Sequence, residues 1–294
     1  MHPPVALARG RPHFADETAG ASVLFRKMCR LFGFRSQSPS AVHRSLVGAS
    51  NALRVQSRAH PDGWGIGWWS EEGPPQLVRS AGAAHAEPEF VRSAEQVRAT
   101  SVIAHIRKAS VGPVRLDNAH PFRWGPWLFA HNGTVAHFDR HRGAIERAID
   151  PAFANVVVGD TDSARCFGLF LTRLSRLADP SGNVAMDALA RALGETVHAI
   201  AAITDADAEV PSATTFLVGN GRLMLACRRG RTLWYAPHGG TSANDAVDRL
   251  IIASEHVCPS EPWIEVPHDG MIGVDGDLRL HRYHLADWQQ RRSA

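Results

Sequence analysis

Two amphipathic helices in the middle of the chain, with strands gathered before and after them, restrict the fold more than any other feature. Between Asp162 and Ala178, apolar residues recur at the spacing of one helix face, and residues 184–203 have the same character. Strand-like segments form blocks on either side of this pair and do not alternate with helices. Such blocks favour an α+β layered sandwich over a doubly wound sheet.

The flanking segments can be placed by their apolar patterns. Before the helix pair, strands are expected at residues 29–34, 77–79, 101–106 and 127–130, and helices at 40–59, 88–99 and 139–149. Residues 60–69 are expected to form a glycine-punctuated turn that enters an aromatic strand. After it, strands are expected at 216–218, 223–225, 232–235, 250–253 and 271–274. Ser40 is a plausible cap for the first helix, and Asn220-Gly221 is a hairpin signal. No linker or repeat interrupts residues 29–294, so we expect one domain there.

The first 28 residues differ from the rest of the chain. They are rich in turn-forming residues and show little periodicity. Three interpretations compete: a start codon assigned upstream of Met28, a propeptide that is removed, and a disordered extension. The first is favoured, and the chemistry described below requires that this segment be absent from the active protein.

Composition excludes several classes of protein. The net charge of +3 comes from basic residues interspersed with acidic ones, which argues against a dedicated nucleic-acid surface. No apolar run approaches the roughly 20 residues that span a bilayer. The four cysteines lie far apart without CxxC spacing, which fits a reducing cytosol and predicts a cytoplasmic protein without structural zinc. The scattered histidines form no HxH or HExxH pattern, so no metal or cofactor is predicted.

Cys29 directly follows a methionine, which is how a cell places a cysteine at a mature N-terminus. An initiator methionine is removed when the next side chain is small. The free α-amine, with a pKa of about 8, could then serve as general base for the thiol of the same residue. The alternative is a buried structural cysteine beside a strand.

A thiol that attacks a carboxamide also needs donors for the developing oxyanion, and Asn132-Gly133 could supply them. The pair follows an apolar strand, so an asparagine amide and a glycine N–H could point at one oxygen. Glycine permits the close approach that this requires. The same dipeptide is also a common turn signal.

Three further residues could hold a substrate. Arg107 follows the strand that ends at Ile106, and its guanidinium suits an α-carboxylate; a surface salt bridge is the alternative. Asp162 begins the first central helix and could hold an α-ammonium group, although Asp160 lies close by and either could be a helix cap. His120, in a His-Pro turn, could support the site or order its loop.

Taken together, these motifs resemble the class II glutamine amidotransferases, an N-terminal-nucleophile family. The resemblance covers residues 29–275 and rests on six short motifs in family order. They are Cys-Arg at 29–30, HPDGWG at 60–65, AHIRKAS at 104–110, NAHPF at 118–122, HNG at 131–133 and GDTDS at 159–163. The start and the HPDGWG motif are most similar to the small stand-alone members that include the γ-glutamyl hydrolase of the ergothioneine pathway.

The resemblance implies a four-layer αββα sandwich, Cys29 as an N-terminal nucleophile, and an oxyanion hole from Asn132 and Gly133. It also implies that Arg107 and Asp162 hold the glutamate end of the substrate. The large synthases of the family carry an aromatic residue and a Thr-His pair after the arginine, whereas this chain has Lys108, Ala109, Ser110 and Val111.

Three functions follow as hypotheses. The first is an amidohydrolase that cleaves glutamine or a γ-glutamyl amide through a Cys29 thioester, with a small molecule as its substrate. The second is a glutaminase subunit that supplies ammonia only in complex with a partner synthase, and the third is a catalytically silent binding protein. A homo-oligomer is possible for any of them.

Overall fold

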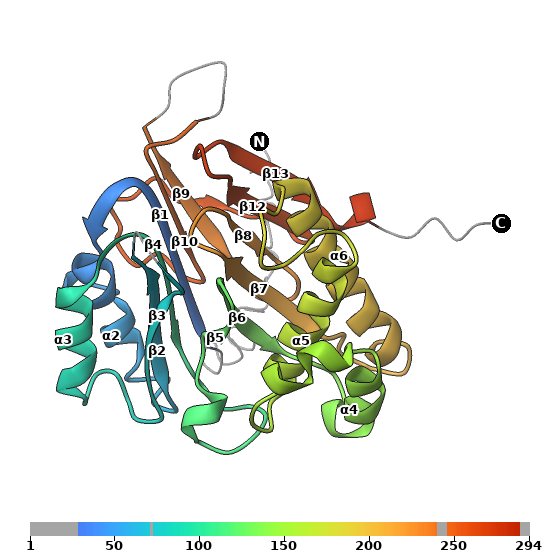
Figure 1. The fold of residues 1–294 in the computed structure, drawn as a ribbon. Helices are drawn as coiled ribbons and strands as arrows, with labels where there is room; N and C mark the ends of the chain where they lie inside the picture. The colour runs from blue at the N-terminus through green and yellow to red at the C-terminus, as the bar shows by residue number, and fades with distance from the viewer. Residues whose placement is uncertain (1–28, 71–72, 240–245, 289–294) are drawn as a thin grey trace, which may run out of the picture.

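The computed structural model describes residues 29–70, 73–239 and 246–288, and its strands form two antiparallel sheets (Figure 1). In the seven-stranded sheet the order is β11 (Ile264–Glu265), β9 (Trp234–His238), β10 (Arg249–Ala253), β1 (Arg30–Ala41), β4 (Arg98–Ile106), β2 (Trp64–Trp69) and β3 (Gln76–Ser80). In the six-stranded sheet it is β13 (Leu280–His284), β12 (Gly270–Val274), β8 (Met224–Cys227), β7 (Ala213–Gly219), β6 (Trp127–Thr134) and β5 (Phe122–Trp124).

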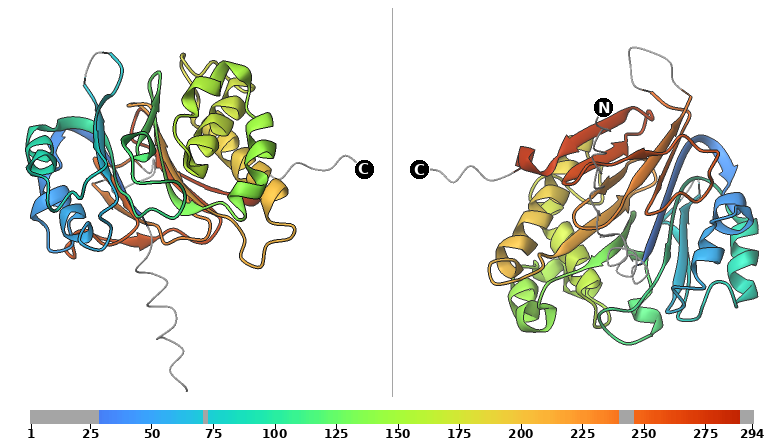
Figure 2. Two further views of the ribbon diagram at one scale, coloured as in Figure 1. Left: turned by 90° about the horizontal axis from the view of Figure 1, so that it is seen from below. Right: turned by 180° about the vertical axis from the view of Figure 1, so that it is seen from behind.

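Helices cover the outer face of each sheet, as the view from below shows (Figure 2). The seven-stranded sheet is covered by the short π-helix η1 (Arg44–Gly48), α2 (Leu53–Gln56) and α3 (Pro88–Gln96). The six-stranded sheet is covered by α4 (Phe138–Arg147), α5 (Asp162–Ser175) and α6 (Met186–Thr204). Short 3-10 turns η2 (Leu116–Asn118), η3 (Pro151–Val156) and η4 (Leu285–Trp288) join or end these elements.

The layers follow from the alternation of side chains along the strands. Leu31 belongs to the core between the two sheets, whereas its neighbour Phe32 packs in the core under α3. The inter-sheet core also contains Ile103, Leu128, Ala130, Leu217, Met224, Ala226 and Ile252. A third core joins the six-stranded sheet to α5 and α6, with Phe129 stacked on Phe167. The prediction of an α+β αββα sandwich is therefore confirmed.

The single helix expected over residues 40–59 is wrong at residues 40 and 41, which belong to a strand, and is broken into two short segments in the remainder. β1 continues to Ala41, where Ser40 and Ala41 pair with Ala99 and Arg98 of β4. Ser40 is therefore a strand residue and caps no helix. Two short helical segments, η1 and α2, follow in place of one long helix. Pairing with β4, far along the chain, outweighs the local helical spacing at this point.

The hairpin between β7 and β8 is confirmed, with its tip one residue later than Asn220-Gly221 suggests. Asn220 and Leu223 pair through their main chains, so Gly221 and Arg222 form the tip. The Asn220 side chain accepts hydrogen bonds from the N–H groups of Arg222 and Leu223. Gly221 has a φ of +89°, which favours glycine.

Candidate active site

Cys29 lies immediately before β1 and is 9% exposed. Antiparallel pairing sets Arg30 of β1 opposite Ile106 of β4, so the residues just beyond both strand ends meet. The main-chain N–H of Lys108 donates to the Cys29 Sγ atom at 3.3 Å, and the Lys108 carbonyl lies 3.4 Å from the same sulfur. The sheet register therefore fixes the position of the thiol.

Burial raises the pKa of the Cys29 thiol above its usual value of 9.0. The N–H of Lys108 and the positive charge of Arg107 act in the opposite direction, and the negative charge of Asp162 adds to the rise. The resting side chain is therefore a neutral thiol, and a nearby base must remove its proton before it can attack a carbonyl.

A small cavity of about 20 Å³ adjoins the sulfur. It is lined by Cys29, Lys108, Ser110, Asn132, Gly133, Thr134 and Arg231. Asn132 is 1% exposed, and neither atom of its side-chain amide has a hydrogen-bond partner in the described part of the chain. An unpaired buried amide costs roughly 1–3 kcal/mol, so its retention beside a thiol indicates a ligand with a polar atom.

Gly133 could not be any other residue in this backbone. A Cβ atom built on it would lie 1.8 Å from the carbonyl oxygen of Ala213 in β7 and 2.5 Å from Nε2 of His131. The strand pairing that sets Gly133 opposite Thr214 leaves this space only for hydrogen. The glycine therefore lets the main chain of β6 reach the cavity beside Cys29.

Arg107 is 2% exposed, and its guanidinium donates to main-chain carbonyls. Nη2 donates to Val111 at 2.9 Å and Gly112 at 3.2 Å, and Nη1 donates to Pro113 at 3.1 Å and Asp62 at 3.5 Å. In this structure the side chain therefore holds the loop after β4 in place. A bound carboxylate would have to replace some of these carbonyls.

Asp162 is 3% exposed and lies at the first turn of α5. Its carboxylate accepts from the N–H of Val135 at 2.8 Å and from the N–H of Ser163 at 2.8 Å. Its charge acts on both Cys29 and Arg107. The structure therefore brings Asp162, Arg107 and the thiol into one electrostatic neighbourhood.

Asp160 lies at the surface and is not part of this group. Its carboxylate is 3.4 Å from the guanidinium of Arg115, and both side chains are exposed. Neither Asp160 nor Asp162 is the helix cap considered from the sequence. Thr161 is the N-cap residue of α5, because its hydroxyl accepts from the N–H of Ala164.

His120 lies in the core and does not line the cavity beside Cys29. Its ring centroid is 4.2 Å from that of His105 and 4.5 Å from that of Phe122. Burial lowers the pKa of His120 well below 6.5, so the ring is neutral. Direct contact between His120 and a substrate remains a prediction that no described contact tests.

His105 joins the two sheets beneath the site. Its Nε2 atom lies 3.2 Å from the carbonyl oxygen of His131 in β6, and a ring nitrogen facing a carbonyl donates. Burial lowers the pKa of His105 to about 3, so the neutral ring bridges β4 and β6. Because His131 directly precedes Asn132, this bridge supports β6 at the point where Asn132 lies.

Four residues that line the cavity beside Cys29 were not predicted as site residues, namely Lys108, Ser110, Thr134 and Arg231, and Arg231 is the one that stands farthest from any motif. It lines the cavity beside Cys29, and it also lines a larger neighbouring cavity of about 420 Å³. Arginine in a loop after a short strand carries no local signal of function. Only the packing of that loop against β7, through the N–H of Arg231 and the hydroxyl of Thr215, brings it to the site.

Across residues 29–70, 73–239 and 246–288, no three His, Cys, Asp or Glu side chains are grouped as metal ligands would be. In the same ranges no helix has the length and apolar character needed to cross a bilayer.

Comparison with known proteins places this geometry in context. Residues 28–279 match the family described as glutamine amidotransferases class-II. The probable glutamine amidotransferase DUG3 of Saccharomyces cerevisiae is 28% identical over 228 residues, which is 68% of this chain and 63% of that protein. The chain therefore spans less than two thirds of the yeast protein. A γ-glutamyl-hercynylcysteine sulfoxide hydrolase of Mycobacterium tuberculosis is 27% identical, over 84% of this chain and 93% of that protein.

Solved structures share the fold. A glutamine aminotransferase class-II domain protein from Silicibacter pomeroyi superposes with a TM-score of 0.61 at 20% identity, over 87% of this chain and 99% of that one. Glutamine phosphoribosylpyrophosphate amidotransferase from B. subtilis gives a TM-score of 0.60 at 17% identity, over 87% of this chain and 49% of that one. At these identities the likeness concerns the fold alone.

Proposed function

The chain belongs to the class II glutamine amidotransferase family, and from this premise we propose that it hydrolyses the γ-carboxamide of glutamine or of a γ-glutamyl amide through a thioester on Cys29. The observation that carries the proposal is the buried, unpaired amide of Asn132 in the cavity that Cys29 lines. A carbonyl carbon bonded to the sulfur would hold its oxygen close to that amide.

The first step needs a base. In a chain that begins at Cys29, the α-amine takes the thiol proton, because a free α-amine has a pKa of about 8. The thiolate then attacks the γ-carbonyl carbon, and the negative oxygen receives hydrogen bonds from Asn132 and from the N–H of Gly133. The fixed positions of both donors in β6 hold them ready before the substrate binds.

The second step releases the amine. The protonated α-amine gives its proton to the leaving nitrogen as the C–N bond breaks, which leaves glutamate bound to Cys29 as a thioester. Water, activated by the same α-amine, attacks the thioester carbon and frees glutamate and the thiol. Asn132 and the N–H of Gly133 donate a second time, to the oxyanion that forms when water attacks the thioester.

The glutamyl group needs partners at its amino-acid end. We assign its α-ammonium group to Asp162, whose oxygens have lone pairs beyond those used by Val135 and Ser163. We assign its α-carboxylate to Arg107, which would exchange carbonyls of residues 111–113 for carboxylate oxygens. The charges of both groups act on the Cys29 thiol, which supports their assignment to one small substrate.

The test combines processing, activity and labelling. Intact mass shows whether the purified chain begins at Cys29, and glutamate release is then measured with glutamine and with γ-glutamyl dipeptides. A diazoketone analogue of glutamine should alkylate the peptide that begins with Cys29, and the variant Cys258→Ala should be labelled equally well. Absence of both release and labelling in a chain that begins at Cys29 would overturn the proposal. Glutamate release only after addition of a synthase would instead favour an ammonia-supplying subunit.

A further inference from the structure

Two larger cavities share lining residues with the cavity beside Cys29. Thr134 lines the cavity beside Cys29 and two larger cavities, one of about 420 Å³ and one of about 500 Å³. The 500 Å³ cavity is lined by Val111, Gly112 and Val135, the residues whose main chains contact Arg107 and Asp162. The glutamyl end of a substrate therefore belongs at the 500 Å³ cavity, and the leaving group belongs at the 420 Å³ cavity.

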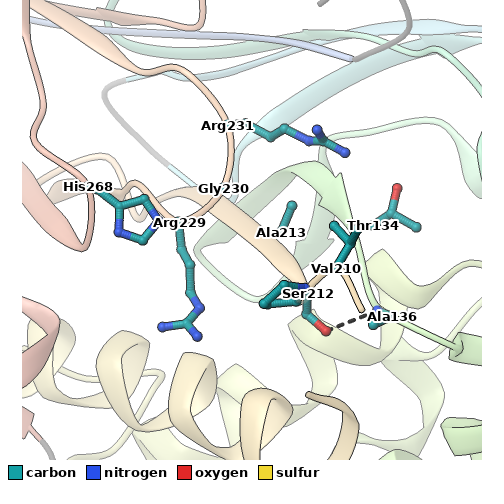
Figure 3. A pocket seen from close by; sticks show the side chains of 10 residues that line it. Thr134, Ala136, Val210, Ser212, Ala213, Arg229, Gly230, Arg231 and His268 are labelled. Carbon is teal, nitrogen blue, oxygen red and sulfur yellow. Dashed lines mark hydrogen bonds between the residues drawn. The ribbon is translucent and has the colours of Figure 1, made fainter. Parts of the chain in front are cut away.

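The 420 Å³ cavity has a cationic wall (Figure 3). Its basic side chains are Arg229, Arg231 and His268, and no acidic residue lines it. Its other residues are Thr134, Ala136, Val210, Pro211, Ser212, Ala213 and Gly230, most of them small or apolar. A molecule that fits such a wall has an aliphatic body and a negative group.

Of the three basic residues, Arg231 is the one without an ion-pair partner among the residues that the structure describes. Arg229 is paired with Asp205 at 3.4 Å and with Asp269 at 3.6 Å, and His268 lies 3.3 Å from Asp269. In the described ranges no carboxylate lies within ion-pair distance of Arg231, and its Nε atom has no hydrogen-bond partner. Figure 3 shows Arg229 turned toward the helices and Arg231 extended on the side of Thr134.

We propose that the 420 Å³ cavity holds the leaving group of the substrate, and that this group is an amino acid or short peptide whose carboxylate pairs with Arg231. The proposal rests on the hydrolase function proposed above and narrows it to γ-glutamyl conjugates of amino acids. Ammonia, which is about the size of a water molecule, fills roughly 30 Å³ and would leave most of this cavity unused. Free glutamine is accordingly the poorer substrate.

One alternative role for Arg231 must be separated from this one. Its charge also acts on the Cys29 thiol, so it could stabilise the thiolate for every substrate alike. A carboxylate partner, in contrast, favours only leaving groups that carry a carboxylate. Two substrates that share the glutamyl group and differ in that charge distinguish the roles, namely γ-glutamylglycine and γ-glutamylglycinamide.

The experiment compares the ratio of kcat/KM for these two dipeptides among variants. The wild-type enzyme should favour γ-glutamylglycine by about ten-fold or more, as expected for a charged hydrogen bond. Arg231→Gln should bring the ratio close to one, and Arg231→Lys should restore part of it. Arg222→Gln, on the exposed turn at the other end of β7, should keep the wild-type ratio. A wild-type ratio near one, or a ratio that Arg231→Gln leaves unchanged, overturns the proposal.

A binding measurement separates this proposal from the hydrolase function. Titration calorimetry on the Cys29→Ala protein should show about ten-fold tighter binding of γ-glutamylglycine than of γ-glutamylglycinamide. The double variant with Arg231→Gln should bind both alike. Selective binding without turnover by the wild-type enzyme would contradict the proposed hydrolysis and support the carboxylate site. Equal affinity of the Cys29→Ala protein for both dipeptides would overturn the site.

Discussion

The main-chain N–H of Lys108 donates to the sulfur of Cys29 from 3.3 Å, across the ends of two paired strands. The hydrogen bond opposes the rise in pKa that burial causes in this thiol. Because the donor belongs to the backbone, its direction depends on the register of β1 against β4 and not on a rotamer. The proposed nucleophile is therefore positioned by the fold itself.

Replacement of the proposed nucleophile should abolish turnover. Cys29→Ala removes the only proposed attacking atom, so glutamate release should fall by at least about a thousand-fold. The thermal midpoint should change little, because Cys29 lies at the end of a strand beside a cavity. Cys258→Ala is the matched control, since Cys258 belongs to a separate small core, and it should stay active. Retained activity in Cys29→Ala would rule out the thioester.

Removal of the unpaired amide should separate activity from stability. Asn132→Ala should lower kcat by about 10²–10³, the effect of losing one oxyanion donor. Its free energy of unfolding should stay equal or rise, because the buried amide has no partner to lose in the described part of the chain. Urea unfolding and steady-state kinetics measure the two effects. A large loss of stability would show that the amide has a structural partner.

Addition of one methyl group should be costly at Gly133. A Cβ there meets the Ala213 carbonyl at 1.8 Å, so Gly133→Ala should destabilise the protein by about 2 kcal/mol or more and lower activity. Gly48→Ala is the control, because a Cβ at Gly48 meets nothing within 4 Å. That variant should stay within about 0.5 kcal/mol of wild type in urea unfolding. Equal stability of the two variants would contradict the packing described for β6.

The two neighbouring aspartates should differ in their effect on substrate binding. Asp162→Asn removes the charge proposed to hold the α-ammonium group, so KM should rise by about ten-fold or more. Asp160→Asn alters only an exposed pair with Arg115, worth at most about 1 kcal/mol, and should change KM less than two-fold. Steady-state kinetics with one γ-glutamyl substrate decides between them. A larger effect at Asp160 would reverse the assignment.

Stability should fall in mild acid. Burial lowers the pKa of His60 to about 4 and that of His105 to about 3 in the folded chain, against about 6.5 when unfolded. Below pH 6.5 the unfolded chain binds protons that these rings do not, so unfolding becomes easier as the pH drops toward 4 and 3. Between pH 7.5 and 5, each ring should contribute a loss of about 2 kcal/mol.

Urea unfolding at the two pH values measures this loss. His60→Gln should remove the contribution of that ring and so reduce the difference between pH 7.5 and 5. His43→Gln, at a side chain that is 39% exposed, should leave the difference unchanged. An equal difference in wild type and His60→Gln would show that His60 is charged in the folded protein at pH 5.

Sequence patterns predicted the central elements well, because the apolar spacing that indicates each of them lies within the segment itself. The apolar spacing after Asp162 and after Val184 corresponds to α5 and α6, and the apolar strand before Asn132 corresponds to β6. The extension of β1 to Ala41 was not predictable in this way. Gln37, Ser38 and Ser40 have no strand character. Their strand conformation depends on distant partners, since the N–H of Gln37 donates to Asp248 and Ser40 pairs with Ala99 of β4.

The site was predictable only in part, for a similar reason. Cys29, Asn132 and Gly133 stand in motifs, and they were therefore expected to lie close together. In the structure all three line one cavity. Arg231 stands in no motif and reaches the same cavity only through the loop after β8. Arg107 was expected to face a ligand, yet its hydrogen bonds in this structure go to loop carbonyls. The hydrogen-bond partners of the Arg107 guanidinium depend on the path of the loop at residues 111–113. The spacing of motifs in the sequence does not reveal that path.

The sulfur and the donors proposed for its oxyanion belong to different sheets. Cys29 leads into the seven-stranded sheet, and Asn132 lies in the six-stranded one. The thickness of the packing layer between them, filled by residues such as Leu31 and Ala130, therefore sets the gap across which catalysis would operate. A bulkier side chain at Ala130 would widen that gap and slow the reaction without touching any atom of the cavity.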